Sequence, residues 1–274
     1  TTTDGGGGSE RLELGSIRIA GNRRTSLTIN YDRQNALRAS QRPYLLDSDS
    51  PFDRTGNVRA AGGGSIDPAL DALAGRPVTV AAVPLDPARR GTLADYAAGP
   101  RATDLSPFLS LRSRDALKVD GTHAMPIGRT TTASVNLTME AERGRALAGL
   151  QGATLALPAG SALPFAAPLL LDRYLDEWPV LTQRNDNLTL HAGSTVQGGV
   201  GRWNWTVTSG YDRVRARAAV DRGVAPAALQ AAVDTGANPF DLGTVIAAQP
   251  MLVTRSRTVT GTLTAKATAN GPVL

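Results

Sequence analysis

The chain has 274 residues, a formal net charge of +5, an aromatic content of 4% and no cysteine. The missing cysteine excludes a disulfide framework and any cysteine-based redox or metal site. The basic residues are nearly all arginines dispersed along the chain, and base-stacking aromatics do not accompany them, so we expect no nucleic-acid partner. No apolar run reaches the roughly 18 residues of a transmembrane helix, although membrane-crossing strands carry a weaker signal.

The N-terminal part predicts a hairpin after a glycine-rich linker. Residues 10–20 and 24–35 read as strands around a turn at Gly21 and Asn22. Successive side chains of a strand point to opposite faces, so alternation reveals its two sides. In the second strand one parity is apolar and the other polar, although the first strand is ambiguous. The apolar residues are Leu27, Ile29 and Tyr31, and the polar residues are Thr28, Asn30 and Asp32.

Three long regions interrupt the remaining strands. Residues 43–107, 148–183 and 221–251 are rich in Pro, Gly, Asp or Ala, and we interpret them as long loops with short helices at 67–74, 86–97 and 225–233. Asp47, Asp49 and Asp53 are expected in a solvated acidic loop, because Phe52 stands where a calcium-binding EF-hand requires glycine. The strands between these regions are predicted at 108–124, 130–146, 184–217 (a hairpin) and 252–268.

The hairpin at 184–217 has one apolar and one polar face. Trp203, Trp205, Val207 and Tyr211 share the apolar parity. This face suits the inside of a soluble sandwich or the lipid side of a membrane barrel, and periodicity does not choose between them. Residues 202–211, tilted by about 40°, span roughly 25 Å, the height of a membrane barrel's apolar band. In a barrel, the aromatics predicted to form the membrane-interface girdle are Trp203, Trp205, Tyr211 and Tyr31.

The lengths of the connections favour the barrel. Tight turns predicted at 21–22, 126–128, 198–201 and 270–272 alternate with the three long regions. Long strands, short turns at one end and long loops at the other describe a transmembrane barrel with periplasmic turns and extracellular loops. We therefore predict an all-β fold, an antiparallel transmembrane β-barrel segment with long extracellular loops and short periplasmic turns. About seven strands are too few to close, so residues 1–274 are expected to be part of a longer protein.

Arginines follow the apolar residues on the lipid-facing parity, toward the long loops. We expect these arginines to meet anionic headgroup phosphates above the hydrocarbon, whereas solvated strand ends are the plainer alternative. The headgroup-facing candidates are Arg143, Arg145, Arg213, Arg215, Arg217, Arg255 and Arg257. Asp115 breaks the pattern, because it shares the parity of Leu117 and Val119, and this predicts a bulge or a different register there.

These residues resemble the TonB-dependent outer-membrane receptors of Gram-negative bacteria. The resemblance lies in the hairpin residues NLTLHAG (187–193) and GRWNWTVTSGYDR (201–213), the strand RRTSLTINYDR (23–33) and the terminal TAKATANGPVL (264–274). It implies a barrel of about 22 strands with an N-terminal plug, located in the cell outer membrane, that imports a scarce ligand. The implied partners are outer-membrane lipid and lipopolysaccharide, an unknown small ligand, and the TonB protein, which would bind a missing N-terminal part. The sequence shows no plug, no TonB box and no aromatic C-terminal residue.

Catalytic motifs are absent. His123 and His191 are the only histidines, and no G-x-S-x-G, P-loop or H-E-x-x-H motif occurs, so we expect no enzymatic activity, no metal and no cofactor. No residue is assigned to ligand binding. Two alternatives stay open: another outer-membrane barrel, such as an autotransporter translocator or an usher, and a secreted all-β adhesin-type binding module.

Overall fold

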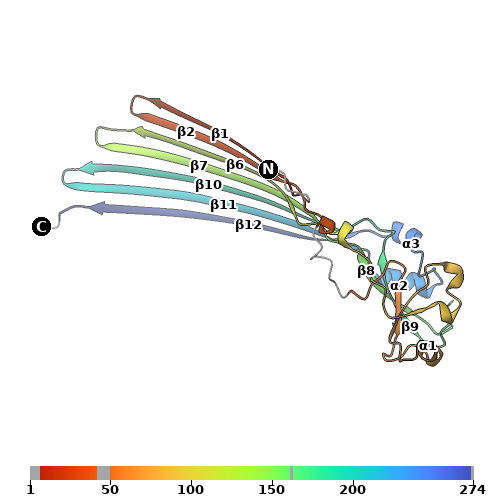
Figure 1. The fold of residues 1–274 in the computed structure, drawn as a ribbon. Coiled ribbons are helices and arrows are strands. Elements are labelled where there is room, and N and C mark those ends of the chain that lie inside the picture. The colour runs from red at the N-terminus through yellow and green to blue at the C-terminus, as the bar shows by residue number, and fades with distance from the viewer. Residues whose placement is uncertain (1–6, 42–49, 161–162, 273–274) are drawn as a thin grey trace.

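The computed structural model describes residues 7–41, 50–160 and 163–272. It is mostly antiparallel β-sheet and has two parts, a sheet of long strands and a compact loop module at one end of it (Figure 1). The long sheet has seven strands in the order β1-β2-β6-β7-β10-β11-β12. These strands are β1 (Ser9–Ala20), β2 (Arg23–Gln34), β6 (Ser113–Pro126), β7 (Thr131–Leu147), β10 (Thr182–Val200), β11 (Trp203–Gly223) and β12 (Leu252–Asn270).

The predicted strands are confirmed to within a few residues, with two larger differences: the strand expected at 108–124 begins at Ser113, and the hairpin expected to end at residue 217 continues to Gly223. The tight turns contain Gly21 and Gly201, with φ of 58° and 60°, a left-handed conformation that favours glycine. The turn expected at 198–201 is shorter than predicted, because β10 continues to Val200. The long sheet is open within the described part of the chain, with β1 and β12 at its edges.

The long regions contain the short helices at 67–74 and 225–233 that the sequence predicts, but the first two regions, 43–107 and 148–183, also form β-strands that were not predicted from the sequence. They supply a second sheet of five strands in the order β5-β4-β3-β9-β8. Its strands are β3 (Asn57–Ala60), β4 (Val80–Ala82), β5 (Ala97–Ala98), β8 (Gln151–Leu157) and β9 (Leu169–Leu175). With the helices α1 (Pro68–Ala74), α2 (Pro226–Asp234) and α3 (Gly243–Ala247) they form what we call the loop module (Figure 1). Segments far apart in sequence therefore depend on one another for burial.

The helices at 67–74 and 225–233 are confirmed as α1 and α2. Asp67 caps α1, because its carboxylate accepts a hydrogen bond from the backbone N–H of Ala69 at 2.7 Å. The helix expected at 86–97 is instead two short 3-10 helices, η3 (Pro87–Arg89) and η4 (Leu93–Asp95). They are separated at Gly91 and Thr92, where glycine and an extended threonine disfavour a continuous helix. Two further 3-10 helices are η1 (Ala39–Gln41) and η5 (Ser106–Phe108).

The hydrophobic core lies in the loop module. Buried leucines of β8 and β9, including Leu155, Leu169 and Leu171, pack with Leu229 of α2 and Ile246 of α3. No large hydrophobic side chain of the seven long strands is among the buried residues of the described chain. On β12, Leu263 is 78% exposed, whereas Leu171 on β9 is fully buried. One part of the molecule thus has an ordinary core, and the other is a single layer.

The side-chain amides of two glutamines join the third long region, residues 221–251, to β8. Gln151 at the start of β8 makes two hydrogen bonds of 2.8 Å with the backbone of Val224. Gln230 of α2 bonds the N–H and C=O of Ala156 at 2.8 and 3.0 Å, so its amide covers the edge of β8. An exposed strand edge would otherwise offer unpaired backbone groups to other chains.

Asp53 is buried, which corrects the expectation of a solvated acidic loop. It accepts hydrogen bonds from the hydroxyl of Thr103 at 2.9 Å and the N–H of Thr55 at 3.0 Å, and lies 3.3 Å from Arg101. Its partners hold the chain before β3 against the segment that precedes η5. Asp47 and Asp49 lie outside the described residues.

Truncation of the module's core should unfold the module, whereas truncation on the long sheet should not. We expect Leu171→Ala to lower the free energy of unfolding by about 2–5 kcal/mol, because the site is enclosed and a cavity remains. Denaturant unfolding followed by circular dichroism measures the change. Leu263→Ala is the matched control, and an equal loss there would contradict the assignment of the core.

Tyr96 should ionise late. Its ring packs edge-on against Phe165 at a centroid distance of 4.8 Å, its hydroxyl donates to the Arg90 carbonyl at 2.9 Å, and burial raises its pKa to about 12. The folded pKa exceeds the unfolded value, so this contribution to stability is complete below about pH 10 and is lost as pH rises toward 12. The difference in ultraviolet absorbance between wild type and Tyr96→Phe should therefore titrate near pH 12. A midpoint near 10 would contradict the burial.

Candidate functional site

The register of the long sheet aligns one apolar surface across all seven strands. Leu12, Tyr31, Leu117, Ala141 and Leu188 are consecutive cross-strand partners. Neighbours in a ladder point to the same side, so the apolar parities of β2, β6, β7, β10, β11 and β12 fall on one side of the sheet, which we call the apolar face. The parity of β1 changes along its length: Leu12 and Leu14 lie on the apolar face, whereas Ile17 and Ile19 lie on the other. This change explains the ambiguity of the first strand.

All four predicted girdle aromatics lie on the apolar face, but not at one level. Trp203 and Trp205 begin β11 beside the short turn, opposite Val200 and Gly198. Tyr211 pairs with Ala192 and Leu263, and it lies four residues along β11 from Arg215, which belongs to the row that contains Tyr31.

The indole of Trp205 packs over Gly198, where a Cβ would lie only 2.8 Å from the ring. An aromatic ring over a cross-strand glycine fills the space left by the missing side chain.

The predicted headgroup-facing arginines also lie on the apolar face, toward the loop module. Cross-strand partners place them on adjacent rows: Arg145 with Arg184, Arg217 with Arg257, Arg215 with Val259, and Arg213 with Gly261. Arg143 is joined to Asp186 at 3.6 Å, and Arg255 lies one row beyond Arg257. The structure therefore collects these arginines at one end of one face. Their contact with lipid stays a prediction.

Asp115 lies in register, and the predicted bulge at this position is wrong. β6 pairs without interruption with both β2 and β7. Asp115 belongs to a row of charged partners that crosses the whole sheet, which we call the charge row. It consists of Glu10, Arg33, Asp115, Arg143, Asp186, Arg217 and Arg257. Asp115 lies 3.7 Å from Arg33 and accepts a hydrogen bond from the Tyr31 hydroxyl at 3.1 Å. Asp115 interrupts the apolar parity of β6, but it continues the row of charged residues that crosses the sheet.

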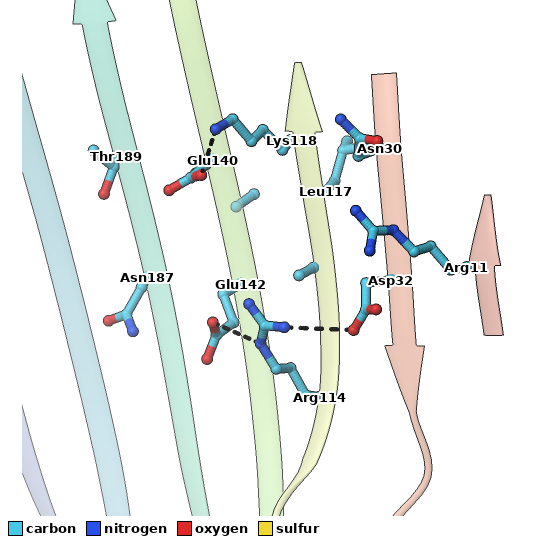
Figure 2. A pocket seen from close by; sticks show the side chains of 12 residues that line it. Arg11, Asn30, Asp32, Arg114, Leu117, Lys118, Glu140, Glu142, Asn187 and Thr189 are labelled. Carbon is cyan, nitrogen blue, oxygen red and sulfur yellow. Dashed lines mark hydrogen bonds and ion pairs between the residues drawn. The ribbon is translucent and has the colours of Figure 1, made fainter. Parts of the chain in front are cut away.

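The opposite side of the sheet, the polar face, carries a charged hollow of about 410 Å³ (Figure 2). Arg114 lies between two carboxylates in this hollow, 2.9 Å from Glu142 and 3.4 Å from Asp32. Lys118 lies 3.3 Å from Glu140. The carboxylate of Glu142 also forms an ion pair with Arg112 at 2.7 Å. These partners come from β2, β6, β7 and the residue before β6, so the network joins adjacent strands across the polar face.

Several polar groups of the hollow have no hydrogen-bond or ion-pair partner within the described part of the chain. The amide oxygen of Asn30 is buried and lacks a hydrogen-bond partner among the described residues. Arg11, Asn187 and Thr189 also line the hollow, and Figure 2 shows them around its charged centre. The hollow therefore combines neutralised charges with unused donors and acceptors, an arrangement that suits water or a polar solute better than an apolar one.

The histidines take part in polar contacts on opposite faces. His191 Nδ1 lies 2.6 Å from Asp212 on the polar face, and His123 Nδ1 lies 2.8 Å from the hydroxyl of Thr25 on the other. Across residues 7–41, 50–160 and 163–272, no group of three or more His, Asp or Glu side chains is placed to hold a metal ion. Among the residues that the structure describes, neither histidine has both a nucleophile and an acid arranged around it as a triad requires.

Comparisons with known proteins give no family for this chain. No protein-family model, no curated protein and no solved structure matches it. In the part of the chain that the structure describes, no helix is long and apolar enough to span a membrane. The fold defines the chain as an antiparallel β protein with a single-layer sheet and a folded loop module.

Neither the charge row nor the hollow could be predicted from the individual strands, and the reason is the same for both. Each strand contributes one residue to the charge row and at most four to the lining of the hollow, and the sequence does not state which residues are opposite one another. Arg112 pairs with Glu142 in the polar-face network. It lies just before β6 and is therefore not part of that strand's alternation of apolar and polar residues. The available signal was Asp115 itself, an acid at an apolar parity.

Glu142→Gln should weaken the polar-face network by about 1 kcal/mol. The substitution removes the charge shared by Arg112 and Arg114, and exposed pairs contribute roughly 0.2–1 kcal/mol each. Thermal unfolding in low salt measures the loss, which should shrink in 1 M salt because ions screen the pairs. Glu13→Gln, on the same face without an ion pair among the described residues, is the control. Equal losses from both substitutions would contradict the network.

Proposed function

We propose that the chain forms part of the wall and the external loops of a β-barrel in a bacterial outer membrane, within a receptor that imports a scarce ligand. The observation that carries this proposal is the uncovered apolar face. Leu14, Leu137 and Leu263 are 55%, 56% and 78% exposed, and no second layer covers them among the described residues. A continuous apolar surface of this kind needs an apolar surrounding, and lipid supplies one.

The polar face supports the same proposal from the other side. Its strands present Thr, Asn and charged residues, and its hollow has neutralised ion pairs and free polar groups. A water-filled barrel interior is the environment that such a face requires. The charge row and the arginines beyond it mark the upper limit of the apolar band, where side chains leave the hydrocarbon.

The two ends of the sheet support an orientation. The short turns form one end, and the loop module forms the other (Figure 1). Outer-membrane barrels carry short turns on the periplasmic side and long loops outside. We therefore place the loop module outside the cell, where its folded surface is available for ligand capture. Among barrels, a receptor energised through TonB rests on the resemblance of the hairpin at 187–213.

The direction of the two faces is tested on β12 by two neighbouring residues. In the full-length protein, Leu263→Arg should lower the free energy of unfolding by about 2–4 kcal/mol, because it places a charge toward lipid. Thr262→Arg should be tolerated, because it points to the polar face beside Asp212. Assembly into the outer-membrane fraction and unfolding in lipid bilayers are the measurements. The reverse order would place the polar face toward lipid, and wild-type protein in the detergent-free soluble fraction would rule out the membrane.

Transport is tested in cells that express the full-length protein. Uptake of labelled ferric siderophores, cobalamin, oligosaccharides and peptides is compared in cells with and without TonB. The receptor proposal expects one ligand class to enter only when both the protein and TonB are present. Uptake that persists without TonB would reassign the protein to another class of barrel.

A further inference from the structure

The charge row is balanced at one end and unbalanced at the other. On β1, β2 and β6, Arg33 lies between Glu10 and Asp115, with Asp115 at 3.7 Å. On β11 and β12, Arg217 and Arg257 are directly opposite each other. Like charges at opposite positions of a ladder repel and destabilise the pair. An anion bound between them would remove the repulsion.

The residues around Arg217 and Arg257 include several more arginines and few acidic residues. From the row of Arg255 to the row of Gly261, the apolar face of β10, β11 and β12 carries Asp186 as its acidic residue. Its basic residues on these rows are Arg184, Arg213, Arg215, Arg217, Arg255 and Arg257. Asp186 is already joined to Arg143 at 3.6 Å. In the described part of the chain, Arg217, Arg255 and Arg257 form no ion pair.

A hollow of about 380 Å³ opens between these arginines. Arg217, Arg255 and Arg257 line it, with Asp186 and Ser256. Next to it, the Nε of Arg215 is buried without a hydrogen-bond partner among the described residues. Guanidinium groups bind carboxylates and phosphates through paired, charge-assisted hydrogen bonds, and a phosphate group has more acceptor oxygens and more charge to share among several of them.

The apolar residues that follow the hollow along β12 indicate that the phosphate belongs to a molecule with an apolar part. Along β12, Arg257 is followed on the same face by Val259, Gly261 and Leu263, and Val259 and Leu263 are 45% and 78% exposed. The Tyr211 side chain lies beside Gly261. A Cβ added at Gly261 would lie 3.5 Å from the hydroxyl oxygen of Tyr211. Arg213 and Arg217 are about 13 Å apart along the strand, so the anionic zone leads directly into an apolar track.

We propose that Arg217, Arg255 and Arg257, with Arg215, form a binding site for the phosphate group of an anionic lipid, whose acyl chains lie along Val259 and Leu263. The anion part of the site rests on the arginines alone, and the lipid part rests on the proposed function. The balanced end of the charge row, around Arg33, is not part of the site. This difference along one row supplies a matched control.

The test uses full-length protein in neutral detergent micelles. Binding of short-chain phosphatidic acid, phosphatidylcholine with the same chains, and inorganic phosphate is measured by titration. The wild type should bind phosphatidic acid and not phosphatidylcholine. R217Q/R257Q should bind phosphatidic acid about tenfold more weakly or worse, because charge-assisted hydrogen bonds are lost. R18Q/R33Q removes the same two charges from the same face and should leave the affinity unchanged.

A second measurement separates binding from folding. In lipid-free micelles the thermal midpoint of R217Q/R257Q should equal or exceed that of the wild type, because the repulsion between the arginines is gone. Phosphatidic acid should then raise the midpoint of the wild type and of R18Q/R33Q but not of R217Q/R257Q. A variant that unfolds without lipid would show that the pair is structural and overturn the site.

The remaining outcomes are distinct. Equal weakening by R18Q/R33Q would overturn the site, because net charge alone would explain binding, and unchanged binding by R217Q/R257Q would also overturn it. Binding of inorganic phosphate as tight as that of phosphatidic acid would overturn the lipid assignment and identify free phosphate as the ligand. Micelle binding by a protein found outside the outer membrane would leave the anion site standing while the proposed function fails.

Discussion

The cross-strand register of the long sheet is the constraint on which the rest of the structure depends. Side chains alternate along a strand, so a shift of one residue would move every apolar side chain of that strand to the other face. The seven strands stay in register over most of their length, and the one shift at Asp221 and Gly223 lies at the end beside the loop module. Both faces, the charge row and the polar-face hollow follow from this alignment.

Stability is divided unequally between the two parts of the molecule. The loop module buries leucines from β8, β9 and α2 in an ordinary core, whereas the long sheet offers backbone hydrogen bonds and one layer of side chains. A single layer gains little from burial in water, because each apolar side chain keeps one open side. The sheet therefore depends on its surroundings, and the module is joined to the end of β11 through the hydrogen bonds between Gln151 and Val224.

The arginines have two different settings on one face. Where acids alternate with them, as around Arg33 and Arg143, the charges are matched within the sheet. Where β11 and β12 meet, Arg217 faces Arg257 and no acid separates them. The same residue type can thus stabilise the sheet in one place and require an external anion in another. The difference depends only on the cross-strand neighbour.

The sequence by itself determined the long strands, their two-sided character, the tight turns at glycine, and the helix that Asp67 caps. These features are local, because alternation, φ > 0 at glycine and a capping carboxylate act within a few residues. The sequence also placed Trp203, Trp205, Tyr211, Tyr31 and the arginines on the apolar parity, and the register puts them on one face. Only the tertiary structure decided that the long connections form one module, that Asp115 belongs to a charge row, and that Arg114 bridges Asp32 and Glu142. Those features join residues far apart in the chain, and the pairing that brings them together is a property of the whole sheet.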